Sequence, residues 1–264
     1  LEQLARLPGA SGAIDRAAEL VAELQRLEQH AGELADFDYD FLYDANRHLL
    51  AIGYSVTDHR LDNSFYDLLA SEARLASFVA IAQNKLPQEH WFHLGRRVTT
   101  TGGQPTLLSW SGSMFEYLMP LLVMPTYDST LLDATYRAAV ARQIEYGRQR
   151  EVPWGISESG YYKTDAHLNY QYRAFGVPGL GFKRGLGSDL VIAPYASAMA
   201  LMVAPQEATA NLERLDWLRM RNAPDGPVRE PLVELLASSC RSEAWSGELI
   251  ACMTATPTMK DYGA

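Results

Sequence analysis

Glu158 is the first of three glutamates that stand apart from other charges in this sequence. Ser157 and Ser159 flank it, and Trp154 and Tyr162 lie nearby along the chain. A carboxylate among aromatic rings is costly to desolvate unless it is hydrogen-bonded. Such surroundings raise its pKa, which suits an acid or base acting near neutral pH. The alternative is a loop glutamate that caps a neighbouring helix.

Glu72 is the second isolated carboxylate. The pattern of residues 62–84 predicts a helix, and Glu72 falls four residues after Leu68 and four before Ala76. That spacing places it on the apolar face of the predicted helix. A carboxylate there needs a partner or a function. The alternative to a catalytic role is a buried salt bridge to an arginine from another helix.

Glu116 is the third, and it is the single charge in residues 107–127. Ser111 or Ser113 is suited to cap a short helix that Pro120 kinks or ends. Aromatic rings together with a few carboxylates are what a sugar site needs, because sugars present apolar C–H faces and hydroxyl rims. The three glutamates therefore suggest a carbohydrate site.

Composition excludes several other classes. The chain has 264 residues and a net charge of −9, which argues against an electrostatic nucleic-acid binder and gives no basic stripe for an anionic membrane. Cys240 and Cys252 form neither a disulfide framework nor a metal motif, and the His90-x-x-His93 pair lacks further ligands. We expect no metal and no cofactor. Since the first residue is not Met, we expect a segment of a longer protein.

The elements that must position the glutamates are mostly helical by pattern. A short hairpin is predicted within 39–56, and 99–103 and 175–182 are predicted as loops. The alternation of strands and helices typical of a parallel sheet is missing. Apolar periodicity predicts helices over residues 12–35, 62–84, 131–150, 189–203 and 205–218.

Four stretches carry a resemblance to a known family. They resemble the glycoamylase-like domain of cyclic β-1,2-glucan synthases, which is similar to bacterial endo-β-1,2-glucanases. The resemblance implies a mainly α fold, an (α/α)6 toroid that is incomplete in this chain. It implies action on linear β-1,2-glucan, by transglycosylation that releases a ring or by hydrolysis. The stretches are Tyr66–Phe78, Leu108–Val123, Trp154–Ser159 and Tyr170–Gly181.

The resemblance also implies roles for the three glutamates. Glu72 matches the general acid/base position and Glu158 the nucleophile position. Glu116 lies in a motif that lines the groove, and we expect it to be catalytic with the other two. Glycosidic cleavage needs such a pair, one carboxyl to protonate the leaving oxygen and one to attack carbon or activate water. The predicted substrate-binding residues are Asp67, Trp110, Tyr117, Trp154, Tyr162, Tyr170 and Tyr172.

Three regions are predicted: an amphipathic helical segment over 1–36, the glycoamylase-like domain over 37–215, and an atypical tail over 216–264. The tail is expected to be partly disordered or to come from a frameshift or truncated gene. We expect a soluble segment without direct membrane contact, from a bacterial synthase whose other domains are associated with the inner membrane. Two alternatives stay open: a non-catalytic glucan-binding or scaffolding remnant, and a helical domain whose glutamates are structural ion-pair partners.

Overall fold

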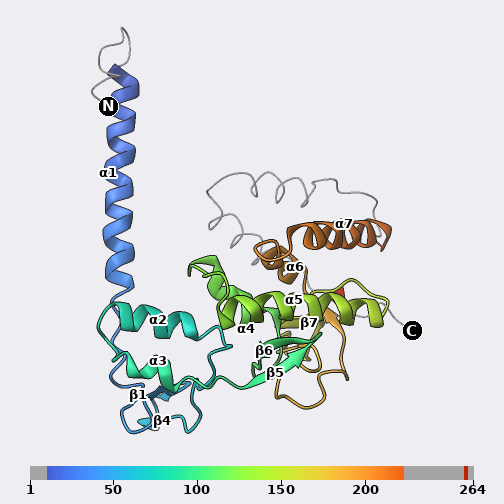
Figure 1. Cartoon of the computed structure of the whole chain (residues 1–264). Coiled ribbons are helices and arrows are strands. Elements are labelled where there is room, and N and C mark those ends of the chain that lie inside the picture. Colours follow the sequence, from blue (N-terminus) through green and yellow to red (C-terminus); the bar gives the residue numbers. More distant parts are fainter. Residues whose placement is uncertain (1–10, 223–258, 261–264) are drawn as a thin grey trace. The chain divides into compact units, whose positions relative to one another are not determined.

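The computed structural model describes residues 11–222 and 259–260 (Figure 1). The chain divides into two compact units, Leu1–Phe41 and Leu42–Ala264. The boundaries predicted at residues 36 and 215 stay predictions. Among the described residues, no helix combines the length and the apolar character that crossing a membrane requires.

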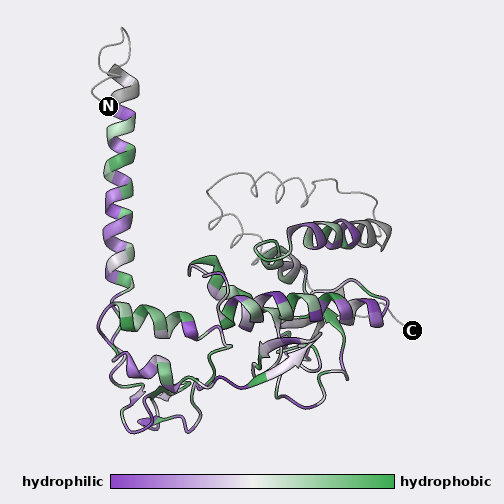
Figure 2. Ribbon diagram, in the orientation of Figure 1, coloured by the Kyte–Doolittle hydropathy of each residue, from purple (hydrophilic) through white to green (hydrophobic). Residues whose placement is uncertain are grey.

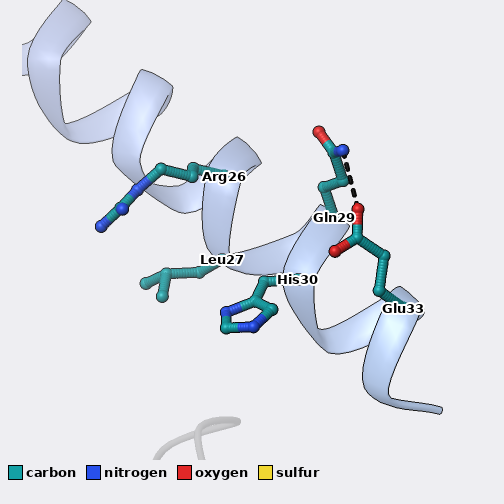
Figure 3. A pocket seen from close by; sticks show the side chains of 5 residues that line it. All are labelled: Arg26, Leu27, Gln29, His30 and Glu33. Atoms are coloured by element: carbon teal, nitrogen blue, oxygen red, sulfur yellow. Dashed lines mark hydrogen bonds between the residues drawn. The ribbon is translucent and has the colours of Figure 1, made fainter.

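The first unit contains helix α1, Ser11–Leu34, close to the helix predicted over 12–35. Hydrophilic and hydrophobic residues alternate along it in Figure 2, as an amphipathic helix requires. Its surface carries pairs at helical spacing, such as the bond from Gln29 Nε2 to Glu33 Oε1 at 2.9 Å. Figure 3 shows this pair beside Arg26, Leu27 and His30. All five side chains line a pocket on helix α1.

The second unit begins with two small antiparallel pairs and two helices. The predicted hairpin is confirmed, because β1 pairs with β2 across the turn at residues 45–48. The pair β3–β4 follows, and then the short helices α2 and α3. The bounds are β1 Tyr43–Asp44, β2 Leu49–Leu50, β3 Tyr54–Ser55, β4 Arg60–Leu61, α2 Arg74–Ala82 and α3 Glu89–His93.

The remainder of this unit alternates hairpins with helices. Hairpin β5–β6 packs along α5, and α6 packs against α7 (Figure 1). The hairpin β7–β8 follows the Glu158 segment, and β9 pairs with β10. The bounds are β5 Val98–Thr101, β6 Gln104–Leu107, α4 Met114–Leu118, 3-10 helix η2 Met119–Leu122, α5 Leu131–Gln149, β7 Ser159–Thr164, β8 Tyr170–Arg173, β9 Val191–Ile192, α6 Pro194–Ala200, α7 Pro205–Asn222 and β10 Met259–Lys260.

The predicted (α/α)6 toroid is wrong for the part of the chain that the structure describes. A toroid of that kind is a ring of helical hairpins, whereas here β-hairpins stand between α1 and α2, between α3 and α4, and between α5 and α6. Residues 99–103 were predicted as a loop and instead belong to β5–β6, where Gly102 and Gly103 both have positive φ at the turn. Two-residue hairpin turns favour glycine for this reason.

The helix predicted over 62–84 is also largely wrong, because only Arg74–Ala82 is helical. Residues 65 to 69 make extended pairings instead: Phe65 bridges to Ala51 and Leu68 to Gly95. The Leu69 amide donates to the Gly95 carbonyl at 3.0 Å. These tertiary pairings override the local helical pattern, as they commonly do. Glu72 therefore lies in the turn before α2 and not on a helical stripe.

Two other predicted helices are confirmed, and each begins at a residue whose side chain caps it. α5 begins after Thr130, whose side chain accepts from the Asp133 amide. α4 begins after Ser113, with a capping box to Glu116, and Pro120 follows in the 3-10 helix. The helix predicted over 189–203 begins only at Pro194, since proline favours the first turn.

The loop containing Gly176 and Gly181 packs against residues 109–112. The Ser109 amide donates to Leu180 at 3.0 Å, and the Val177 amide to Gly112 at 3.1 Å. A Cβ on Gly176 would lie 1.8 Å from the Ser111 carbonyl oxygen, and a Cβ on Gly181 would lie 2.5 Å from the Gly112 nitrogen. These glycines serve close backbone approach, and the contact holds the Glu116 loop in place.

Candidate active site

The segment that carries Glu158 is fixed by side chains from three helices. Gln143 of α5 bonds both the amide and the carbonyl of Ile156, each at 2.8 Å. Asn211 of α7 accepts from the Trp154 amide at 3.1 Å and donates to its carbonyl at 2.8 Å. Tyr195 of α6 donates to the Glu158 carbonyl at 2.6 Å. These anchors fix the backbone up to the residue where β7 begins.

The half-buried Glu158 carboxylate receives a hydrogen bond from the Tyr172 hydroxyl. Tyr172 lies on β8, and its backbone partner in β7 is Gly160. Hairpin β7–β8 therefore carries both groups. Burial raises the pKa of the Tyr172 phenol, and its bond to Glu158 and the charge of that carboxylate raise it further, so the phenol stays protonated and available as a donor.

Glu72 lies in the turn before α2, where the Ser71 hydroxyl donates to its Oε2 at 3.2 Å. Arg74, two residues on, is fully buried and donates to the carbonyls of Ser71 and Glu116, each at 2.8 Å, and to that of Tyr117. This arginine ties the Glu72 turn to helix α4 through backbone oxygens. The position of Glu72 relative to α4 is thereby set.

The two carboxyls share one electrostatic neighbourhood. Burial raises the pKa of Glu158, the Tyr172 hydrogen bond opposes that rise, and the charge of Glu72 adds to it. Burial likewise raises the pKa of Glu72, and the charge of Glu116 adds to it. Glu72 and Glu158 together also raise the pKa of Tyr66, after burial. The charge of Glu72 thus acts on Glu158, and each of the two carboxyls is biased toward the protonated form.

Glu116 is held very differently. It is 4% exposed, and its two carboxylate oxygens accept from the hydroxyls of Ser109, Ser111 and Ser113 and from three backbone amides of the same loop. With six donors its acceptor capacity is filled. Such a carboxylate organises its loop and has little capacity left to accept from a substrate.

The predicted substrate-binding residues separate by exposure. Trp110 is 51% exposed, its indole donates to Asp67 Oδ1 at 3.2 Å, and its ring centroid lies 5.9 Å from that of Phe182. Tyr117 and Trp154 are instead 1% and 7% exposed. The Tyr117 hydroxyl bonds backbone groups of the surrounding loops, including the Leu180 carbonyl at 2.7 Å. Trp110 and Asp67 can therefore meet a ligand, whereas the other two pack the core.

Two predicted residues lie partly outside what the structure describes. The backbones of Tyr162 and Tyr170 belong to β7 and β8, but their side chains are outside the described part. Tyr66, Tyr195 and Lys183 were not selected from the sequence. Their tertiary contacts bring them to the site, and only Tyr66 had a signal, since it adjoins Asp67.

The ion-pair alternative makes a testable statement about geometry. Within the described residues, no salt bridge joins an arginine or lysine to Glu72, Glu116 or Glu158. The described side chains also contain no group of three or more candidate ligands that could hold a metal ion. The neighbourhood of Glu72 and Glu158 offers proton transfer and nucleophilic attack by carboxyl groups.

Comparisons with known proteins give a family match and a related protein. The Glycoamylase family model matches residues 64–223. The chain is 50% identical over 209 residues to a protein of Rhizobium meliloti strain 1021 named cyclic beta-(1,2)-glucan synthase NdvB. That match covers 78% of this chain and 7% of the relative, so the chain spans a small part of that protein's length. The resemblance found in the sequence is confirmed, and the chain belongs to the glycoamylase family.

Proposed function

We propose that this chain is a domain that cleaves linear β-1,2-glucan and transfers the cleaved end, the ring-closing step of a larger bacterial synthase. The observation that carries the proposal is the shared electrostatic neighbourhood of Glu72 and Glu158, two carboxyls with raised pKa that form no salt bridge among the described residues. Structural glutamates are normally paired or saturated with donors, as Glu116 is. The relative's name supplies the substrate class.

Glu72 acts as the acid in the first step of the proposed reaction. It gives its proton to the glycosidic oxygen while a carboxylate oxygen of Glu158 bonds to C1. The C1–O bond breaks, and its electron pair stays with the leaving oxygen. Burial favours this step on the Glu72 side, because it raises the pKa of that carboxyl and so keeps the proton available.

An acceptor hydroxyl attacks C1 in the second step. Glu72 takes the proton of that hydroxyl, and Glu158 leaves as a carboxylate. A sugar hydroxyl from the same glucan closes a ring, whereas water gives a shorter linear chain. Exclusion of water from the groove would favour the ring. The exposed Trp110, oriented by Asp67, supplies a face on which a glucose unit stacks.

Incubation of the chain with linear β-1,2-glucan tests the proposal. Chromatography and mass spectrometry distinguish the products, because a ring is lighter by one water than the linear glucan of the same length. The proposal expects rings, shorter chains or both. Retention of the glucan without any change in its length distribution would contradict catalysis and leave the glucan-binding remnant as the better account.

The setting within a larger protein is part of the same proposal. Since the relative extends far beyond the matched region, we propose that other domains of the synthase make the linear glucan and deliver it to this one. Association of the parent protein with the inner membrane would then come from those domains. Expression of the full-length synthase with and without Glu158→Gln, followed by analysis of linear and cyclic products, separates the two activities.

A further inference from the structure

Tyr172 and Glu158 are carried by a single hairpin. Glu158 directly precedes β7, and Tyr172 lies on β8, where its Cα partner is Gly160. The Tyr172 hydroxyl donates to Glu158 Oε2. Because donor and acceptor stand two residues apart across paired strands, the hairpin itself sets their separation.

The backbone of Glu158 is fixed by another tyrosine. Tyr195 of α6 donates to the Glu158 carbonyl at 2.6 Å, and its hydroxyl lies 2.9 Å from Ser157 Oγ. The Phe115 amide at the start of α4 donates to the same Ser157 oxygen at 2.9 Å. One tyrosine thus holds the main chain of Glu158 and the other holds its carboxylate.

The charges that face Glu158 come from several segments. Glu72 in the turn before α2 and Glu116 in α4 are negative and raise the pKa of Glu158, after the larger effect of burial. Lys183, whose Nζ donates to the Ala174 carbonyl at 2.8 Å, acts in the opposite direction. The Tyr172 hydrogen bond lowers the pKa more than Lys183 does. A nucleophile must be ionised, so its surroundings need such a donor.

We propose that Tyr172 is a positioning residue that holds the Glu158 carboxylate in one orientation and in its anionic form for attack on C1 of a glucose unit. The inference rests on the proposed function and deepens it. It differs from the expectation that Tyr172 contacts the substrate, by ring stacking or by hydrogen bonding. The two roles differ in what they need, because stacking uses the ring and positioning uses the hydroxyl.

Tyr172→Phe separates these roles, since it keeps the ring and removes the hydroxyl. Tyr195→Phe is the matched control, because it removes a hydroxyl that bonds the Glu158 carbonyl instead of the carboxylate. Circular dichroism checks that both variants fold. Two quantities are then measured: kcat/KM for linear β-1,2-glucan across pH, and the titration of the Glu158 carboxyl by ¹³C NMR.

We expect Tyr172→Phe to lower kcat/KM by about tenfold at its optimum, as loss of a hydrogen bond to a charged group does. The acidic limb of the profile and the Glu158 titration both move to higher pH. Tyr195→Phe leaves that titration where it is in the wild type. An unchanged titration and acidic limb in Tyr172→Phe would overturn the proposal and favour stacking.

Failure of this inference is distinct from failure of the proposed function. Full activity in Glu158→Gln would remove Glu158 from the reaction and with it the proposed chemistry. An inactive Glu158→Gln combined with a normal pH profile in Tyr172→Phe would reject only the positioning role. The NMR titration of Glu158 does not depend on turnover. It therefore shows whether the Tyr172 hydrogen bond lowers the pKa of Glu158 even if the chain has no activity.

Discussion

Glu116 and Glu158 are the same residue type in one unit of the chain, yet their surroundings differ in kind. Glu116 is 4% exposed, and six donors of its own loop fill its carboxylate. Glu158 is half-buried, and the Tyr172 hydroxyl donates to its carboxylate. Both stand alone in apolar sequence, so isolation in the sequence does not separate structural from reactive carboxylates.

The number of donors separates them. A saturated carboxylate stabilises the groups that surround it, whereas a carboxylate with few donors keeps lone pairs for a proton or a carbon atom. Burial without saturation raises the pKa, as it does for Glu72 and Glu158. The Glu116 loop therefore serves as a support, and our proposal assigns the reactive roles to Glu72 and Glu158.

Removal of the Glu116 carboxylate should have the largest effect on stability. Glu116→Ala leaves three serine hydroxyls and three amides without their acceptor, and we expect a loss of about 3–5 kcal/mol in the free energy of unfolding. Urea denaturation measures it. Glu145→Gln is the control, because its ion pair with Arg142 is on the surface and is worth about 1 kcal/mol or less. Similar urea midpoints for Glu116→Ala and Glu145→Gln would mean that the Glu116 carboxylate stabilises the fold no more than a surface ion pair does.

The contact that supports the Glu116 loop gives the next effect. Gly181→Ala places a Cβ against the backbone of Ser111 and Gly112, so we expect a loss of about 1–3 kcal/mol. Thermal unfolding checks this against Gly53→Ala, where nothing lies within 4 Å of the added Cβ. A Gly181→Ala chain as stable as Gly53→Ala would mean that the two loops do not pack as closely as described.

Trp110 and Trp154 sharpen the distinction between ligand-facing and supporting residues. Trp110→Ala should weaken glucan binding about tenfold, or about 1.4 kcal/mol, with less than about 0.5 kcal/mol lost in stability because it is exposed. Trp154→Ala removes a buried ring and should act on stability instead. Calorimetric titration of oligosaccharides in a Glu158→Gln background measures binding. Lost stability in Trp110→Ala together with weakened glucan binding in Trp154→Ala would mean that Trp154 faces the ligand and Trp110 supports the fold.

The pH dependence gives the smallest effect. The proposed first step needs an ionised Glu158 and a protonated Glu72, and burial raises the pKa of both. The acidic limb, set by Glu158, and the basic limb, set by Glu72, should therefore lie at higher pH than ordinary carboxyls would give. The pair titrates as a coupled unit. A profile of kcat/KM whose limbs match free glutamate would contradict the described burial.

The sequence predicted what depends on local signals. The cap expected at Ser111 or Ser113 and the apolar periodicity of residues 131–150 are short-range features, and α4 and α5 form there. Residues 62–73 also have a helical pattern, but pairing of Phe65 with Ala51 and of Leu68 with Gly95 decides their structure. Ala51 lies 14 residues before Phe65, and Gly95 lies 27 residues after Leu68. A local apolar pattern carries no information about such distant partners. The toroid, which the resemblance implied, is wrong because β-hairpins stand among the described helices.

The candidate residues were selected from the sequence for partly mistaken reasons. Glu72 was selected as a carboxylate on a helical stripe, whereas it lies in the turn before α2. Tyr195 and Lys183 reach Glu158 through tertiary structure. No spacing along the chain points to them, since each is more than 20 residues from Glu158 in the sequence.

The most direct measurement compares the rate of β-1,2-glucan cleavage in Glu72→Gln, Glu158→Gln and Glu116→Gln, each expressed per folded molecule. We predict that the first two variants lose at least about 100-fold in rate with an unchanged unfolding temperature. We predict that Glu116→Gln unfolds at lower temperature and keeps most of its rate per folded molecule. Wild-type rates in Glu72→Gln or Glu158→Gln would contradict the assignment of the reactive pair.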